Sequence, residues 1–137
     1  MIASARPHLG LTFDTGALIA LERRRDAMRK VFATAIKNHV VITVPVVVVT
    51  EWWRAGRREK ERLGILRSVR VEALVEHVAR VAGAALGRTP GAGAIDAIVV
   101  ASAATRGDIV YTSDPDDLEA LRDANEVFAA VRILGCG

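Results

Sequence analysis

The sequence predicts an α/β fold, a single-domain α/β/α sandwich built around a mostly parallel central sheet. Short apolar segments of strand composition alternate with longer segments of helical composition, which is typical of layered parallel sheets. The 137 residues suffice for one compact domain with one core. Hydrophobic residues make up 51% of the chain and aromatic residues only 4%, so Val, Ala, Leu and Ile must fill that core. We therefore expect residues 1–137 to form one domain.

The first half of the chain predicts two strands and two helices. Residues 9–13 are apolar and lead into Asp14-Thr15-Gly16, which indicates a buried strand followed by a helix over 15–37. Residues 40–43 indicate a second strand. Pro45 can then begin a helix that reaches about residue 55, because the N–H that proline lacks would be unpaired there. The valines at 46–49 favour a strand instead, so the residues alone leave this segment open.

The second half continues the alternation. After the charged segment 57–62, residues 69–71 predict a strand and residues 73–86 a helix. Residues 87–93 contain three glycines and a proline, which predicts a loop. Residues 94–106 form a predicted helix of small residues that stops at Gly107. Two more strands, 109–112 and 131–134, enclose a helix over 115–122.

Charge is unevenly distributed along the chain. The net charge is +3, but residues 1–70 hold 14 Lys or Arg against 6 Asp or Glu, whereas residues 71–137 hold 5 against 10. A basic surface beside an acidic pocket would suit a polyanion that is held while metal ions act on it. Charge runs alone favour a plainer interpretation, which is two solvated faces.

Several classes of protein can be set aside. The longest apolar stretch, residues 40–49, is shorter than the roughly 20 residues that span a bilayer. The first residues lack the basic start and apolar core of a secretory signal, so we expect a cytoplasmic protein. The single cysteine, Cys136, cannot form an internal disulfide. The three histidines have no metal-ligand spacing, and neither a Gly-x-Ser-x-Gly elbow nor a Gly-Lys-Ser/Thr phosphate loop is present.

Four acids stand out because each is a lone charge in an apolar or strand-end setting: Asp14, Glu51, Asp96 and Asp114. Each alone has a structural explanation, as a helix cap, a partner of a helix dipole or a solvated group. Asp14 and Asp114 follow predicted strands, whose carboxyl ends share one edge of a parallel sheet. The helices that carry Glu51 and Asp96 must pack closely, where an unpaired carboxylate is costly.

These acids need a cationic partner that the sequence does not place near them. Between Arg88 and Arg122 the only basic residue is Arg106. Converging carboxylates repel one another and raise their pKa values unless a divalent metal ion neutralises them. Oxygen ligands without cysteine or histidine favour Mg²⁺ or Mn²⁺ over zinc.

Four pieces of sequence occur in one order between residues 11 and 134: Phe13-Asp14-Thr15-Gly16, Glu51, Asp96 within Ile95–Ala101, and Tyr111-Thr112-Ser113-Asp114-Pro115-Asp116-Asp117-Leu118. In this order and spacing the sequence resembles the PIN-domain ribonuclease family. Its small size resembles the VapC-type toxins of toxin–antitoxin systems. The resemblance implies a PIN-like fold, and it favours a helix for the valine segment.

The resemblance also implies a site and a reaction. Asp14, Glu51, Asp96 and Asp114 would be the catalytic, metal-binding carboxylates, with Asp116 as a further metal ligand and Thr112 as a hydrogen-bonding support. Asp117 stands where an aromatic residue is common in the family, so which of the two neighbouring acids faces the metal stays open. The implied reaction is Mg²⁺-dependent hydrolysis of RNA, with Mn²⁺ as the alternative ion.

The implied partners are an RNA substrate, a cognate antitoxin and a second copy of the chain. Arg54, Arg57 and Arg58 follow Glu51 and would hold either the RNA backbone or an acidic tail of the antitoxin. Arg23, Arg24 and Arg25 are equally well explained as solvated side chains.

Two other functions share an acidic pocket. A catalytically weak RNA-binding or regulatory protein would keep the fold without turnover, but all four acids are present. A Mg²⁺-dependent phosphatase or phospho-receiver would need a second Asp two residues after the first, or a late lysine. Here Gly16 stands at that position and Lys60 is the last lysine.

Overall fold

The computed structural model describes residues 9–54 and 58–137. Its five strands form one sheet in the order β3-β2-β1-β4-β5, and each neighbouring pair is parallel. The strands are β1 (Leu11–Phe13), β2 (Ile42–Pro45), β3 (Arg70–Glu72), β4 (Ile109–Thr112) and β5 (Arg132–Gly135). The predicted α/β class is confirmed, and the sheet of the described residues is parallel throughout.

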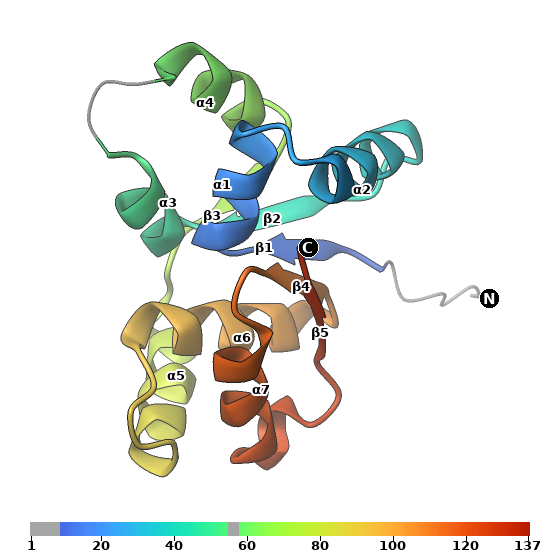
Figure 1. The fold of residues 1–137 in the computed structure, drawn as a ribbon. Helices are drawn as coiled ribbons and strands as arrows, with labels where there is room; N and C mark the ends of the chain where they lie inside the picture. The colour runs from blue at the N-terminus through green and yellow to red at the C-terminus, as the bar shows by residue number, and fades with distance from the viewer. Residues whose placement is uncertain (1–8, 55–57) are drawn as a thin grey trace, which may run out of the picture.

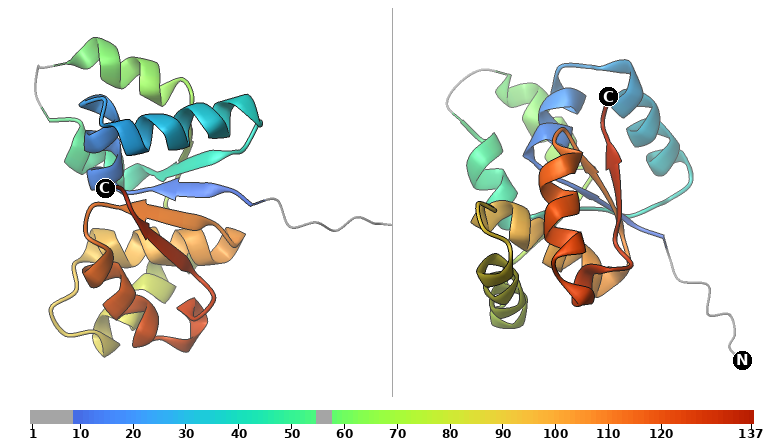
Figure 2. Two further views of the ribbon diagram at one scale, coloured as in Figure 1. Left: turned by 45° about the vertical axis from the view of Figure 1, so that its right-hand side comes forward. Right: turned by 60° about the horizontal axis from the view of Figure 1, so that its bottom comes forward.

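Helices cover both faces of this sheet (Figure 1 and Figure 2). On one face lie α1 (Thr15–Glu22), α2 (Asp26–Lys37) and α4 (Glu59–Leu66), and on the other lie α5 (Glu76–Arg88), α6 (Ala94–Arg106) and α7 (Pro115–Asp123). Helix α3 (Val46–Trp52) packs against both α1 and α6. A 3₁₀ turn, Glu126–Phe128, precedes β5. The arrangement is a three-layer α/β/α sandwich.

The strand order creates a switch point between β1 and β4. These two strands are neighbours, but the helix that follows β1 lies on one face of the sheet and the helix that follows β4 lies on the other. Open α/β sheets bind their ligands in the crevice outside the carboxyl ends of two such strands. The topology therefore marks the ends of β1 and β4 as the place to look for a site.

One predicted helix is two helices in the structure. The segment 15–37 breaks after α1, where Arg24 adopts a left-handed backbone conformation with φ 57°. The backbone N–H of Arg23 donates to the carbonyl of Ile19, and that of Arg25 donates to the carbonyl of Ala20. These hydrogen bonds close the end of α1 and turn the chain into α2 without a glycine or proline, which is why composition did not reveal the corner.

The valine run is helical, against its intrinsic propensity. Pro45 ends β2 rather than beginning the helix, and α3 starts at Val46. Val48 and Trp52, four residues apart, are both buried on the same side of α3. Burial of this face outweighs the modest preference of β-branched residues for strands.

Other boundaries also differ from expectation. The charged segment after residue 57 leads into α4, which was not predicted because its sequence has little apolar periodicity. Helix α5 continues through Gly87 and Arg88, so the loop there begins only at Thr89. None of the helices in the described part of the chain is long and apolar enough to span a membrane.

Candidate metal centre

Asp14 lies at the carboxyl end of β1, where the chain enters α1. The residue is 7% exposed, and its Oδ1 accepts a hydrogen bond from the backbone N–H of Ala17 at 2.9 Å. The side chain therefore caps α1. Burial raises the pKa of Asp14 and the charge of Glu51 adds to this, whereas hydrogen bonds from Thr112, Ala17 and Gly16 lower it.

Thr112 links the ends of the two central strands. Its side chain is fully buried at the end of β4, and its hydroxyl oxygen accepts a hydrogen bond from the backbone N–H of Asp114 at 2.9 Å. The same hydroxyl favours the charged form of Asp14 by hydrogen bonding, which lowers the pKa of that carboxyl. The structure thus brings Asp14 and Asp114 to one edge, and Thr112 makes a hydrogen bond to each of these residues.

Glu51 turns toward the start of α1 rather than toward solvent. Its Oε1 accepts a hydrogen bond from the hydroxyl of Thr15 at 2.5 Å. The next residue, Trp52, donates from Nε1 to Oε1 of the buried Glu22 at 2.9 Å, which joins α3 to α1 a second time. Two side-chain hydrogen bonds therefore fix the face of α3 that carries Glu51.

Asp96 lies in the first turn of α6 and is half-buried. Its pKa is raised to about 6, first by burial and then by the charges of Asp14, Asp117, Glu51 and Asp114. These carboxyl groups come from the end of β1, from α3, from α6 and from the start of α7. They are close enough to Asp96 for their charges to disfavour its ionisation.

The two neighbouring acids of α7 are placed differently. The pKa of Asp117 is raised by a side-chain hydrogen bond with Asp114 and by the charge of Asp114. Asp117 also acts on Asp96, whereas the charge of Asp116 acts on Asp117 but not on Asp96. The structure therefore brings Asp117, rather than Asp116, next to the other carboxylates.

Buried acids elsewhere in the structure have arginine partners. Glu22 pairs with Arg62 at 2.8 Å, and Asp108 pairs with Arg106 at 2.8 Å. Within residues 9–54 and 58–137, no Lys, Arg or His forms an ion pair with Asp14, Glu51, Asp96 or Asp114. Among the buried acids of the described residues, Asp14 is thus the exception, because it has no arginine partner.

The donor set suits a hard divalent cation. It consists of carboxylate oxygens with the hydroxyls of Thr15 and Thr112 beside them, and Mg²⁺ and Mn²⁺ prefer such oxygen ligands. In the described residues, no three acidic, histidine or cysteine side chains already stand in a ligating arrangement. Holding an ion therefore requires rotation of side chains, and Glu51 would exchange its contact with Thr15 for the metal.

Two of the three predicted RNA-binding or antitoxin-binding arginines have contacts within the protein. Arg54 donates from Nε to the carbonyl of Glu51 at 3.1 Å, and Arg58 donates to the carbonyl of Glu22 at 3.4 Å. Both side chains remain exposed. Arg57 lies outside the described residues.

Sequence reasoning missed Thr15, Gly16 and Ser113. A Cβ on Gly16 would lie 1.8 Å from the Oγ of Ser113, so only glycine lets α1 approach the loop after β4 this closely. The signal for all three was their position, since each is within two residues of Asp14 or Asp114.

Comparisons with known proteins agree with this architecture. The family model described as "PIN domain" matches residues 11–124. The search of curated proteins gave no significant match. Similar solved structures include a chain of the DNA-bound VapBC of Salmonella typhimurium, with a TM-score of 0.72 and 16% identity over 94% of this chain and 99% of that one.

Two further structures extend the comparison. A chain of VapBC2 from Rickettsia felis, bound to a promoter DNA fragment, matches with a TM-score of 0.72 and 12% identity over 93% of this chain and 98% of that one. A chain of a toxin–antitoxin complex from Klebsiella pneumoniae matches with a TM-score of 0.61 and 16% identity over 79% and 89%. At these identities the matches establish a shared fold. PIN domains are nucleases that generally use divalent metal ions. With the family model spanning most of its length, this chain belongs to the PIN-domain family.

Proposed function

We propose that this protein is a Mg²⁺-dependent endoribonuclease that acts as the toxin of a type II toxin–antitoxin pair. The observation that carries the proposal is the acidic group at the switch point between β1 and β4. Carboxylates from three other segments act on Asp96 there and raise its pKa, and no cationic side chain of the described residues pairs with Asp14, Glu51, Asp96 or Asp114. Such a group suits a metal ion better than any structural role, because it opposes folding when its charges are unmatched.

The residues that would hold Mg²⁺ are Asp14, Glu51, Asp96 and Asp114, with Asp117 favoured over Asp116 as the additional acid. When bound, the ion would supply a water nucleophile at neutral pH and neutralise the charge that develops on phosphate. Burial raises the pKa of Asp14, and hydrogen bonds from Thr112 and from the start of α1 offset part of this rise by favouring the charged form that would bind the ion.

Membership of the PIN family supports nucleic acid as the substrate, and the likeness to VapBC chains supports the narrower role of toxin. A solved complex described as toxin–antitoxin shares the fold, which supports a cognate antitoxin as partner. RNA as substrate and a homodimeric state complete the proposal. Light scattering on the purified chain tests the dimer, which a monomer at all concentrations would rule out.

The direct test measures cleavage of single-stranded RNA by the purified chain. We expect cleavage with MgCl₂ or MnCl₂ and none with EDTA. Asp96→Asn should abolish cleavage while its circular dichroism spectrum matches that of the parent. Asp123→Asn makes the same change of charge at the exposed end of α7 and serves as the matched control. Cleavage in EDTA, or at the parental rate by Asp96→Asn, would contradict the proposal.

A further inference from the structure

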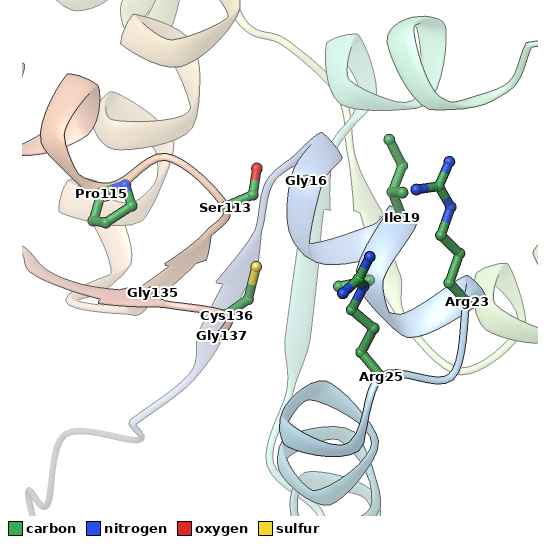
Figure 3. Close-up of a pocket in the computed structure, with 10 residues that line it drawn as sticks. Gly16, Ile19, Arg23, Arg25, Ser113, Pro115, Gly135, Cys136 and Gly137 are labelled. Atoms are coloured by element: carbon green, nitrogen blue, oxygen red, sulfur yellow. The ribbon is translucent and has the colours of Figure 1, made fainter.

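A cavity of about 490 Å³ opens beside the acidic group, between α1, the loop after β4 and the end of β5 (Figure 3). We call it the α1–β5 pocket. Its volume falls within the range of ligand pockets, about 300–1,000 Å³. Arg23 and Arg25 line one side, and Ser113 and Cys136 line the other.

The two arginines are available to an anionic ligand. Both side chains are exposed, and neither takes part in a hydrogen bond or ion pair with a side chain of the described residues. The corner between α1 and α2 holds their backbone, since the N–H groups of both residues donate to carbonyls of α1. Among residues 9–54 and 58–137, no acidic side chain lines the pocket. The pocket thus presents two arginines that form no ion pair with a side chain of the described residues.

Residues next to Asp14 and Asp114 in the chain line the pocket. Gly16 follows Asp14 by two residues and Ser113 immediately precedes Asp114, and both line the pocket. The thiol of Cys136 interacts with charges of both regions. Burial raises the pKa of this thiol, the charge of Asp14 raises it further, and the charge of Arg25 lowers it. A ligand that extends from the carboxylates into the pocket would therefore pass from a negative region to a positive one.

We propose that the α1–β5 pocket binds the nucleotide next to the cleaved phosphodiester, with Arg23 and Arg25 contacting its backbone phosphates. The inference rests on the proposed nuclease function. When the reacting phosphate of an RNA chain lies among the carboxylates, the next phosphate of the chain lies one nucleotide away. Arg23 and Arg25 line the pocket beside the carboxylates, and the exposed parts of Ile19 and Pro115 offer apolar contact to a ribose or base.

The adjacent arginine provides a matched control. Arg24 has a positive φ and lines a different cavity, between α1, α2 and α4, together with Glu22 and Glu61. Replacing Arg24 removes the same charge from the same corner without touching the α1–β5 pocket. A general electrostatic attraction of RNA would respond equally to the loss of any of the three arginines, whereas a defined subsite would not.

The charge test measures binding rather than cleavage. A fluorescein-labelled single-stranded RNA is titrated with the Asp96→Asn protein in MgCl₂ at several salt concentrations. Fluorescence anisotropy of the RNA measures binding. Adding Arg23→Gln and Arg25→Gln should weaken binding and reduce the salt slope by about 0.7 for each lost phosphate contact. Adding Arg24→Gln should leave the slope unchanged. The proposal would be overturned if the salt slope were the same with and without the added substitutions. It would also be overturned if Arg24→Gln reduced the slope as much as the Arg23 and Arg25 substitutions do.

A steric test addresses the cavity itself. A Cβ on Gly135 would lie 3.7 Å from Cγ of Pro115, which is ordinary contact, so the backbone accepts a side chain there. Gly135→Leu should fill the pocket and weaken RNA binding while the salt slope stays unchanged. Unimpaired binding, with a thermal midpoint that shows an intact fold, would contradict the proposal. A polyglutamate peptide provides a further comparison. If the peptide binds only when Arg23 and Arg25 are present, while RNA binding does not depend on them, the pocket would be assigned to an acidic protein segment instead.

These binding measurements separate the two proposals. If the parent protein cleaves RNA but the salt slopes do not change, only the pocket assignment fails. If the slopes change as expected but no cleavage occurs with either metal ion, the nuclease function fails and the pocket remains a binding site for RNA.

Discussion

At the level of single residues, Asp96 shows how the charge of the site opposes folding when no cation is bound. Burial and four neighbouring carboxylates raise its pKa to about 6, from an ordinary value of 3.8. The folded chain therefore holds this proton more tightly than the unfolded chain does. The contribution of Asp96 to the free energy of unfolding is favourable below pH 3.8 and is lost as the pH rises through about 6.

Asp96→Asn should consequently stabilise the metal-free protein at neutral pH. In EDTA, we expect the free energy of unfolding of the variant to exceed that of the parent, by a margin that grows between pH 3.8 and about 6. Urea unfolding of both proteins across this range measures the margin. MgCl₂ should raise the stability of the parent and leave the variant nearly unchanged. A margin that shrinks with rising pH would show that the sign of the shift is wrong.

The two acids at the start of α7 make a second test at this scale. Asp117→Asn should weaken Mg²⁺-dependent cleavage more than Asp116→Asn does, because Asp117 interacts with both Asp114 and Asp96. Dependence of the rate on Mg²⁺ concentration for each variant provides the comparison. The opposite order would assign the metal contact to Asp116, as the family motif alone suggests.

At the level of elements, the close approach of α1 to the loop after β4 depends on Gly16. Gly16→Ala places a Cβ 1.8 Å from Oγ and 2.5 Å from Cβ of Ser113, so helix and loop must move apart. We expect a loss of about 1–3 kcal/mol in the free energy of unfolding, together with loss of cleavage. Gly83→Ala is the control, because nothing lies within 4 Å of its new Cβ. Alanine should stabilise α5 by about 1 kcal/mol at this exposed position in the middle of the helix. Equal behaviour of the two variants would refute the packing argument.

The buried carboxylate of Glu22 holds α1, α3 and α4 together. Its Oε1 accepts hydrogen bonds from Nε1 of Trp52 at 2.9 Å and from Nε of Arg62 at 2.8 Å. Glu22→Gln should cost about 1.5–3 kcal/mol, because it removes the charge opposite Arg62. It should also weaken Mg²⁺ binding, since α3 carries Glu51. Glu61→Gln, exposed on α4, is the control. Calorimetric titration with MgCl₂ that gives the same affinity for both variants would limit Glu22 to a purely structural role.

Propensity and turn chemistry predicted some of these elements and not others. Helix α6 was predicted to its ends, because Gly107 supplies the left-handed residue that stops it. The corner at Arg24 was not predicted, since a left-handed arginine has no signature in the sequence. Helix α3 needed the family resemblance, because only the burial of Val48 and Trp52 decides against a strand.

At the level of the whole molecule, the parallel sheet was predictable from the alternation of strands and helices, but its order was not. The order places β1 beside β4 although nearly a hundred residues separate them, and this adjacency brings Asp14 to Asp114. The four acids could be chosen from the sequence because each is a lone charge in an apolar setting. Thr15, the choice between Asp116 and Asp117, and the α1–β5 pocket could not be predicted, because they depend on side-chain directions across elements distant in sequence.

The most direct measurement is the anomalous difference map of a crystal of this protein soaked in MnCl₂. A Mn²⁺ ion in place of Mg²⁺ should give a peak among Asp14, Glu51, Asp96 and Asp114, with carboxylate oxygens at about 2.0–2.2 Å. The same soak of an Asp96→Asn crystal should show a weaker peak or none. A peak elsewhere, or no peak within bonding distance of these carboxylates at saturating MnCl₂, would contradict the account.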